Sequence, residues 1–200
     1  MGLQGIQVED VFQEIGNVGT GSCMASLSHM ISAEVSYSPP QILKMEYGSL
    51  SDWFGNVGES VVGVLIPFEG DIQGMVLHVY RDEMVKSILE GVLGQNDGHG
   101  ELNGQCLDLL REVANIMGST YLTALASYTG CKISLSSAAV SMDMEGAIIT
   151  ELIGAAGLQE ETMCIGNHFW AKGKAEGSHM LVIMQERSVR RFLEALEVSG

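Results

Sequence analysis

The hydrophobic pattern of this 200-residue chain begins with a helical stretch over residues 8–31. Its apolar residues recur every three or four positions, which is the spacing of one face of an α-helix. Four further positions step by four, three and four and therefore share the opposite face: Asp10, Glu14, Asn17 and Gly21. A carboxylate and an amide one turn apart, beside a glycine, form a surface that another molecule can approach closely.

The same polar stripe occurs again 98 positions later, as Asp108, Glu112, Asn115 and Ser119. When residues 10–38 are aligned with 108–136, most remaining pairs exchange small for small or apolar for apolar residues. Similarity at a fixed offset indicates an internal repeat. A solvated helix face is the ordinary explanation of one stripe, but drift after a duplication would scramble a face without a function. The Glu–Asn pair of each stripe is therefore the leading candidate for a functional site.

Alternating and continuous apolar runs predict the remaining elements. In the first half we expect strands over 34–38, 41–45, 60–67 and 70–80, then a helix over 81–93. In the second half we expect a helix over 105–128, strands over 131–137, 162–172 and 177–184, and a helix over 187–197. The two halves differ in the middle, where we expect a loop over 48–58 that can include one turn around 50–54, and an amphipathic helix over 143–157.

Strands joined mostly by hairpins predict a largely antiparallel sheet with helices packed on it, which is the α+β class. Residues 95–104 are rich in glycine and asparagine and are expected to link two repeats, over about 8–94 and 105–197. We therefore expect residues 1–200 to form a single domain of two helix–strands–hairpin–helix halves. A monomer with internal pseudo-twofold symmetry follows from this arrangement.

Composition narrows the class of protein. The chain is 46% apolar, which is enough to bury a core, and no apolar run reaches the ~18 residues that span a bilayer. The N-terminus lacks a basic segment followed by an apolar one, so we expect a cytoplasmic protein. A formal charge of −15 disfavours nucleic acid and anionic membranes and favours partners that are cationic where they touch.

Three glycines, Gly16, Gly19 and Gly21, interrupt the first helix. Each costs roughly 1 kcal/mol relative to alanine, so close packing or a surface of close approach must compensate. A nucleotide-binding loop is not favoured, because no strand precedes these glycines and no Lys-Ser or Lys-Thr follows them. The five histidines show no metal-ligand spacing.

The chemistry open to a Glu–Asn pair is limited. The asparagine amide can hold a water molecule in position, but it has no useful pKa and cannot act as a base. Orienting water and stabilising charge supply most of the rate in phosphoryl hydrolysis. The glutamate can accept a charge-assisted hydrogen bond from a partner's lysine. Such a pair would complete a site on another protein and hold no metal or phosphate itself.

The spacing Asp-x3-Glu-x2-Asn-x22-Pro resembles the motif of the CheC/CheX/FliY phosphatase family of bacterial chemotaxis. In this chain it consists of Asp10, Glu14, Asn17 and Pro40. The second copy matches at the three stripe positions but has Ala138 in place of the proline. Two sites within 200 residues resemble the CheC-type members, and we expect no flagellar-switch domain of the FliY type.

The resemblance implies a phosphatase that dephosphorylates the phosphorylated response regulator CheY. In this role, Asn17 and Asn115 orient the attacking water, and Glu14 and Glu112 contact the regulator's lysine. The Mg²⁺ and the phosphoaspartate belong to the regulator, so no cofactor is expected on this chain. The family also binds the chemoreceptor deamidase CheD, which is therefore a second expected partner.

Two alternatives remain open. A non-catalytic adaptor for CheD or phosphorylated CheY would not require an amide in both stripes, and a flagellar-switch component would need a further domain. The helix expected over 143–157 is either core or, if partly exposed, a surface that docks a partner by helix-in-groove packing. In the second case CheD is the candidate partner, and the expected contacts are Asp143, Ile148, Ile149 and Leu152.

Overall fold

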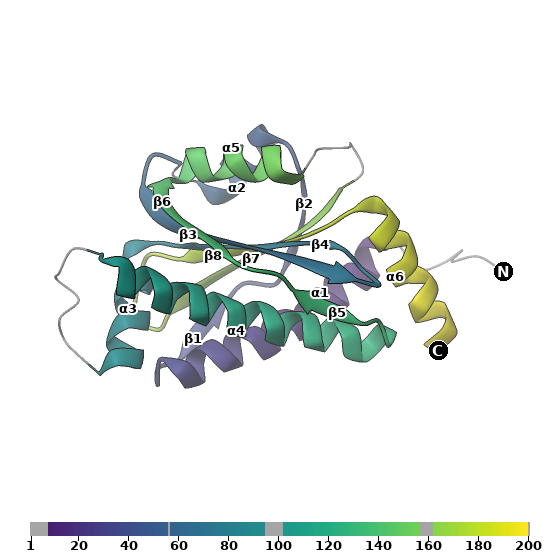
Figure 1. The fold of residues 1–200 in the computed structure, drawn as a ribbon, viewed down its shortest axis with the longest axis horizontal. Helices are drawn as coiled ribbons and strands as arrows, with labels where there is room; N and C mark the ends of the chain where they lie inside the picture. The colour runs from purple at the N-terminus through teal and green to yellow at the C-terminus, as the bar shows by residue number, and fades with distance from the viewer. Residues whose placement is uncertain (1–7, 56, 95–101, 157–161, 200) are drawn as a thin grey trace.

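The computed structural model describes residues 8–55, 57–94, 102–156 and 162–199. One eight-stranded sheet lies between two layers of helices (Figure 1). The long helices α1 (Val8–Met30) and α4 (Gly104–Thr129) cover one face, and the shorter helices α2 (Tyr47–Phe54) and α5 (Glu145–Ala156) cover the other. All described strand pairs are antiparallel, so the predicted α+β class is confirmed.

The strands of the two halves are interleaved in this sheet. Their bounds are β1 Val35–Tyr37, β2 Gln41–Lys44, β3 Ser60–Gly70, β4 Gly74–Tyr80, β5 Ile133–Leu135, β6 Ala139–Met144, β7 Met163–Ala171 and β8 Ser178–Met184. The order is β1-β7-β8-β4-β3-β5, with β2 also paired to β7 and β6 to β3. Because each half supplies edge strands to the other half's hairpin, neither half has a complete sheet of its own. At the centre, Leu77 of β4 faces Leu181 of β8.

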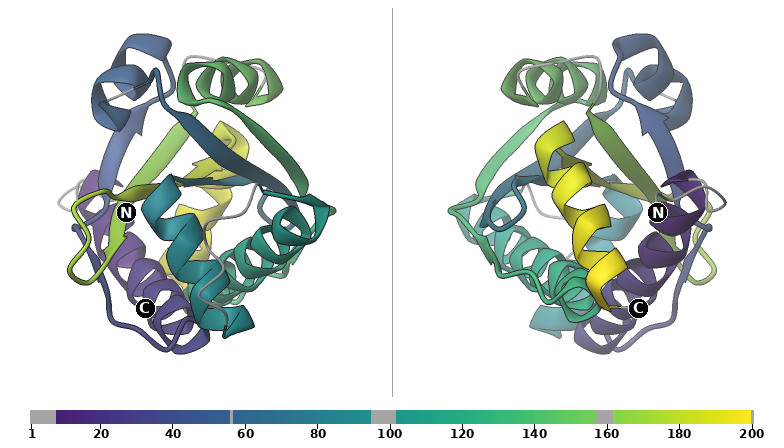
Figure 2. Two further views of the ribbon diagram at one scale, coloured as in Figure 1. Left: turned by 90° about the vertical axis from the view of Figure 1, so that its left-hand side faces the viewer. Right: turned by 90° about the vertical axis from the view of Figure 1, so that its right-hand side faces the viewer.

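The described elements follow the same order twice, α-β-β-α-β-β-α. The third helix of each half, α3 (Asp82–Leu93) or α6 (Glu186–Ser199), packs at one end of the α1–α4 layer (Figure 2). At the α6 end, the rings of Phe12 and Phe192 stack with their centroids 5.2 Å apart. The long helices α1 and α4 run antiparallel to each other. Because both cover the same face of the sheet, their polar stripes belong to the same layer of the molecule.

Two apolar cores lie on the two faces of the sheet. The larger core joins α1, α4, α3 and α6 to alternate residues of the strands, and the smaller joins α2 and α5 to the residues between them. Both faces of β4 and β8 are covered, so these strands are buried almost throughout. This explains why they appear in the sequence as continuous apolar runs rather than as alternating ones.

Two elements in the middle of the halves differ from the sequence prediction. Residues 48–58 form more than a loop with one turn, because α2 occupies Tyr47–Phe54 and buries Leu50 and Phe54 one turn apart. The strand β6 was not predicted, and Asp143 lies in it rather than at the head of a helix. Most β6 side chains are exposed, so backbone pairing with β3, and not a hydrophobic pattern, makes this segment a strand.

Smaller expectations can also be compared with the structure. The strand β3 continues to Gly70, beyond its expected end at residue 67, so the hairpin turn falls at residues 71–73. The predicted linker 95–104 lies mostly outside the described residues, and α4 begins at Gly104. Within the described part of the chain, no helix has the length and apolar character needed to cross a bilayer.

Candidate functional site

The first stripe lies on the solvent-facing side of α1. Asp10, Glu14 and Asn17 are exposed, whereas the opposite side of the helix is buried against the sheet and α4. The glycines explain how α1 fits there. A Cβ at Gly19 would lie 2.8 Å from the ring of Tyr121, so this glycine lets α1 and α4 pack closely. Gly21 lies on the outer side, where the nearest described neighbour of a Cβ would be the Tyr37 hydroxyl at 3.5 Å.

The second stripe has the same placement on α4. Asp108 and Glu112 are exposed and Asn115 is half-buried. Asp108 forms an ion pair with Arg111 at 2.7 Å. The helix begins at Asn103, whose side chain accepts hydrogen bonds from the backbone N–H groups of Gln105 and Cys106. This cap satisfies two of the donors that a helix N-terminus leaves unpaired.

The amides of both stripes are available to a partner. Among the described residues, neither Asn17 nor Asn115 donates or accepts a side-chain hydrogen bond, and Glu14 and Glu112 form no ion pair. An unpaired amide on an exposed helix face can bind water or a partner without losing an internal bond. The structure therefore places each Glu–Asn pair outward, one turn apart, on a helix anchored by its opposite side.

The motif proline packs directly on α1. A Cβ at Gly16 would lie 3.1 Å from Pro40 Cγ, and the Gln13 side chain donates a hydrogen bond to the Pro40 carbonyl at 3.0 Å. At the equivalent positions of the second half, 98 residues later, stand Ala114 and Ala138. The glycine and the proline of the first half are therefore both alanines in the second half. The missing second proline is thus accompanied by a larger residue on the helix.

The residues expected to dock CheD do not form one exposed surface. Ile148, Ile149 and Leu152 are buried in the smaller core, so partial exposure, the condition for helix-in-groove docking, is not met. Asp143 is exposed on β6 and accepts a hydrogen bond from the backbone N–H of Met144 at 2.7 Å. Only this polar residue of the four is placed where a partner could reach it.

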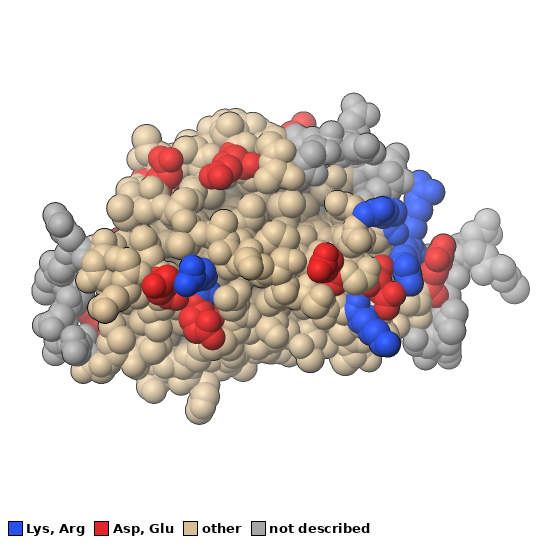
Figure 3. Space-filling model, viewed as in Figure 1, with Lys and Arg blue, Asp and Glu red and all other residues tan. Residues whose placement is uncertain are grey.

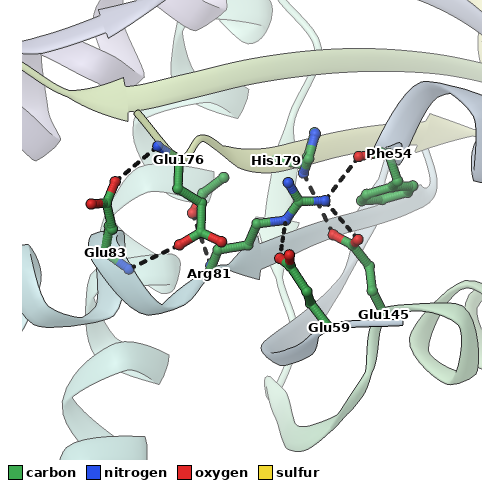
Figure 4. A network of polar contacts seen from close by, with 8 residues as sticks. Phe54, Glu59, Arg81, Glu83, Glu145, Glu176 and His179 are labelled. Atoms are coloured by element: carbon green, nitrogen blue, oxygen red, sulfur yellow. Dashed lines mark hydrogen bonds and ion pairs between the residues drawn. The ribbon is translucent and has the colours of Figure 1, made fainter. Parts of the chain in front are cut away.

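A buried polar network lies on the face of the sheet that α2 and α5 cover (Figure 4). The guanidinium of Arg81 donates to the Glu145 carboxylate at 2.7 Å and to the Phe54 carbonyl at 2.8 Å, and lies 3.7 Å from Glu59. Its chain neighbour Glu83 exchanges hydrogen bonds with Glu176. Arg81 therefore ties α2, α5 and the start of α3 together. Sequence reasoning missed this network, because its members are far apart in the chain and follow no local pattern.

Burial shifts the protonation of this network. Desolvation lowers the pKa of His179 to about 2, and the nearby Arg81 and His168 add to the shift. Desolvation raises the pKa of Glu145, and the hydrogen bond from Arg81 opposes that effect. His179 Nδ1 and Glu145 Oε1 are 3.7 Å apart, too far for a hydrogen bond. The pair is therefore a neutral imidazole beside a carboxylate whose negative charge is stabilised by Arg81.

Two hollows lie on the face of the sheet that α2 and α5 cover. One, of about 370 Å³, is lined by polar side chains that include Arg81, His168 and Glu176. The other, of about 120 Å³, is lined mainly by apolar side chains such as Leu65 and Leu152. In the part of the chain that the structure describes, no group of three or more His, Cys, Asp or Glu side chains could hold a metal ion.

The fold and the doubled stripe are similar to those of CheC-like proteins. A profile of the CheC-like family matches residues 107–137, which contain the whole second stripe and β5. CheC of Bacillus subtilis (strain 168), named CheY-P phosphatase CheC, is 25% identical over 205 residues, and the match covers 98% of both chains. The resemblance predicted from the motif is therefore confirmed.

Solved structures share the fold. The crystal structure of Thermotoga maritima FliY has a TM-score of 0.73 at 18% identity, over 100% of both chains. The chemotaxis protein CheX of Vibrio vulnificus has a TM-score of 0.62 at 17% identity, over 86% of this chain and 99% of its own. The middle domain of FliM from Vibrio alginolyticus also matches, with a TM-score of 0.58 at 16% identity, over 91% of this chain and 97% of its own.

Proposed function

We propose that this chain is a phosphatase that dephosphorylates the phosphorylated response regulator CheY. The observation that carries the proposal is the pair of outward, unbonded Glu–Asn turns on α1 and α4. The similarity along the whole chain to a protein named CheY-P phosphatase CheC supports a chemotaxis phosphatase type of role. The matches to CheX and FliY structures agree with this class through the fold alone.

In the proposed mechanism each helix presents its stripe to the regulator. Glu14 or Glu112 accepts a charge-assisted hydrogen bond from a lysine of the regulator and thereby fixes the orientation of the helix. Asn17 or Asn115, one turn further, then holds the attacking water in line with the phosphoryl group. Because the amide has no useful pKa, its contribution is positioning, which is a large part of the rate in phosphoryl hydrolysis.

The metal and the phosphoryl group belong to the regulator in this proposal. Mg²⁺ on the regulator supplies the charge that stabilises the transferring phosphoryl group. In this proposal the residues of this chain bind the regulator and orient the attacking water, and the chain supplies no cofactor of its own. The rigid support of each stripe matters for this reason, because a displacement of about 1 Å can cost ~100-fold in rate. The close Gly16–Pro40 and Gly19–Tyr121 contacts provide that support for α1.

The proposal is tested by phosphate release from purified phosphorylated CheY. Asn17→Ala and Asn115→Ala should each retain part of the activity, because the other stripe is intact. The double variant should lose about 100-fold or more if both amides orient water. Thr123→Ala, an exposed position of α4 outside the stripe, is the matched control and should behave as wild type. A double variant as fast as wild type would contradict the proposal.

A second candidate function is an adaptor that binds CheD. It is favoured by the edge strand β6, where Met142 and Met144 are 55% and 54% exposed on either side of Asp143. Exposed methionines beside an unpaired strand edge are unusual unless something covers them. Asp143→Lys should weaken CheD binding in a titration and leave CheY dephosphorylation unchanged. Asp52→Lys on α2 is the control for the charge change, and equal CheD affinity of all three proteins would exclude this surface.

A further inference from the structure

The two stripes differ in charge although their motif residues are the same. Asp108 of the second stripe is paired with Arg111, whereas no described cation pairs with Asp10 or Glu14 of the first. The first-half position equivalent to Arg111 is Gln13, which is bound to the Pro40 carbonyl instead. The α1 segment contains no lysine or arginine at all. The first stripe therefore presents two uncompensated carboxylates and the second presents one.

Two arginines of the neighbouring helix α6 are bound away from the first stripe. Basic side chains gather at the α6 end of the face shown in Figure 3. The Arg191 guanidinium binds Asp71 at 2.7 Å, and Arg187 donates hydrogen bonds to Gln73 and to Gln185 at 3.2 Å. These contacts direct both arginines toward the β3–β4 hairpin, while α6 meets α1 through its apolar side.

The stripes also differ in the residue that stands at their far end. Tyr37, the last residue of β1, is 43% exposed and lies over Gly21, with its hydroxyl 3.5 Å from where a Cβ would be. Gly21 follows Asn17 by one turn, so the Tyr37 hydroxyl contacts the helix about 6 Å along its axis from Asn17. The equivalent residue of the second half, Leu135, turns inward toward Gly118 and packs against the larger core.

Free carboxylates beside an exposed aromatic ring suit a cationic partner. A basic segment can pair one cation with a carboxylate and place another cation against the face of a tyrosine ring. The phenolic hydroxyl of Tyr37 is available as well, since no described residue bonds to it. At the second stripe a cationic partner would meet Arg111, which repels it, and would find no exposed aromatic ring at the equivalent position.

We infer that the two stripes are unequal docking surfaces. The stripe on α1, with Tyr37 as a specificity residue, binds a basic segment of the phosphorylated regulator more tightly and with a steeper salt dependence than the stripe on α4. This inference rests on the proposed function, because it assumes that the regulator docks on the stripes. It adds that Asp10, Glu14 and Tyr37 form one cation-binding surface and that Arg111 weakens its counterpart.

Two single-site proteins test the inference. Asn115→Ala leaves the α1 site and Asn17→Ala leaves the α4 site, and each is assayed for phosphate release at low and at moderate salt. The α1-only protein should have a KM lower by about 5- to 30-fold at low salt, which corresponds to one additional ion pair and one cation–aromatic contact. The advantage should shrink as salt rises, because exposed charges are screened. Equal KM values with equal salt dependence would overturn the inference.

Exchanging the differing residues makes the test specific. In the α1-only protein, Tyr37→Leu should raise KM several-fold while kcat changes less than about two-fold, and Tyr37→Phe should keep most of the affinity because the ring remains. In the α4-only protein, Arg111→Gln should lower KM by freeing Asp108. Thermal melting of each variant checks that it is folded. An unchanged KM in both Tyr37→Leu and Arg111→Gln would contradict the inference.

A binding measurement separates this inference from the proposed function. Titration of the same proteins with beryllofluoride-activated regulator reports docking without hydrolysis. If no protein releases phosphate but the α1-only protein still binds more tightly, the unequal docking holds and the phosphatase proposal fails. If hydrolysis depends on both amides but the affinities are equal, the phosphatase proposal holds and the unequal docking fails.

Discussion

Pro40 packs so closely on Gly16 that a Cβ at position 16 would lie 3.1 Å from Pro40 Cγ. A contact of this length allows glycine without strain, and a larger residue must push the proline aside. The loop that carries Pro40 is also held by the Gln13 side chain. The proline of the motif thus supports the helix that carries Glu14 and Asn17. This contact is a physical reason for the fixed spacing between the proline and the stripe.

The first prediction concerns this contact between Pro40 and Gly16. In an Asn115→Ala background, Gly16→Ala should displace Pro40 by a few tenths of an ångström and lower the activity of the α1 site several-fold. Adding Pro40→Ala should restore much of the loss, because the pair then matches Ala114 and Ala138 of the other half. Phosphate release from phosphorylated CheY is the measurement. A double variant no better than Gly16→Ala alone would show that the contact does not govern the site.

The second prediction compares two glycines of the same helix. Gly19→Ala should destabilise the protein by about 1–3 kcal/mol, because the new methyl group would come within 2.8 Å of the buried Tyr121 ring. Gly21→Ala should stabilise it by up to about 1 kcal/mol through helix propensity, since only the Tyr37 hydroxyl lies nearby, at 3.5 Å. Urea unfolding of both variants provides the measurement. Stabilisation by both substitutions would show that propensity dominates over packing at Gly19, and destabilisation by both would contradict the prediction for Gly21.

The third prediction concerns the buried network of Figure 4. Arg81→Met should destabilise the protein by about 3–5 kcal/mol, because the Glu145 carboxylate, fully buried, would lose its charge partner. The deficit should shrink as the pH is lowered, since burial raises the pKa of Glu145 and the protonated acid needs no cation. Chemical unfolding at pH 5 and pH 7.5 measures both effects.

Two variants control this experiment. Lys86→Met, which breaks the exposed Lys86–Asp82 pair of α3, should change the melting temperature little. Arg81→Met combined with Glu145→Met should recover at least half of the lost stability, because no unpaired charge remains in the interior. If the combined variant is as unstable as Arg81→Met alone, the loss comes from packing rather than charge.

The fourth prediction concerns His78, which lies under α4 in the larger core and stacks on Tyr80 with ring centroids 5.8 Å apart. Desolvation lowers the pKa of His78 to about 3, so the folded protein keeps it neutral while the unfolded chain protonates it near 6.5. Stability from this group is therefore complete above pH 6.5 and is lost progressively as the pH falls toward 3. The loss is about 1.4 kcal/mol per pH unit within that range.

His78→Leu should remove this dependence. Both ring nitrogens of His78 lack a hydrogen-bond partner among the described residues, so leucine should also stabilise the protein at pH 7.5. Between pH 7.5 and 5 the advantage of the variant should grow by about 2 kcal/mol. His29→Asn, at the exposed end of α1, is the control and should leave the pH dependence unchanged. A variant that follows the wild-type pH curve would show that His78 is not held neutral.

Most elements of the fold could be predicted from local pattern. Apolar residues recur with a clear pattern in the long helices and in the strands β3, β4, β7 and β8, so these elements can be predicted from the sequence. The helix α2 and the strand β6 could not be predicted in this way. The first is short and contains Gly48, and it forms because Leu50 and Phe54 reach the smaller core. The second has mostly exposed side chains and is a strand because β3 offers it a backbone partner.

Some residues of the candidate site could be predicted from the sequence, and the role of others could not. Both stripes follow from the spacing of a few residues in one helix, so a sequence comparison within the chain can find them. The docking role predicted for Ile148, Ile149 and Leu152 could not be decided from periodicity, because an apolar helix face looks the same whether it meets a core or a partner. Burial in the smaller core answers that question.

The amino-acid sequence by itself determined the α+β class, the doubled Glu–Asn stripe and the resemblance to CheC-like proteins, because each depends on residues within a few helical turns of one another. Only the tertiary structure decided that Pro40 braces Gly16, that Tyr37 stands beside one stripe and that Arg81 joins three helices. These contacts join residues that are tens of positions apart. Their geometry is set by how the helices and strands pack, and no short-range pattern records it.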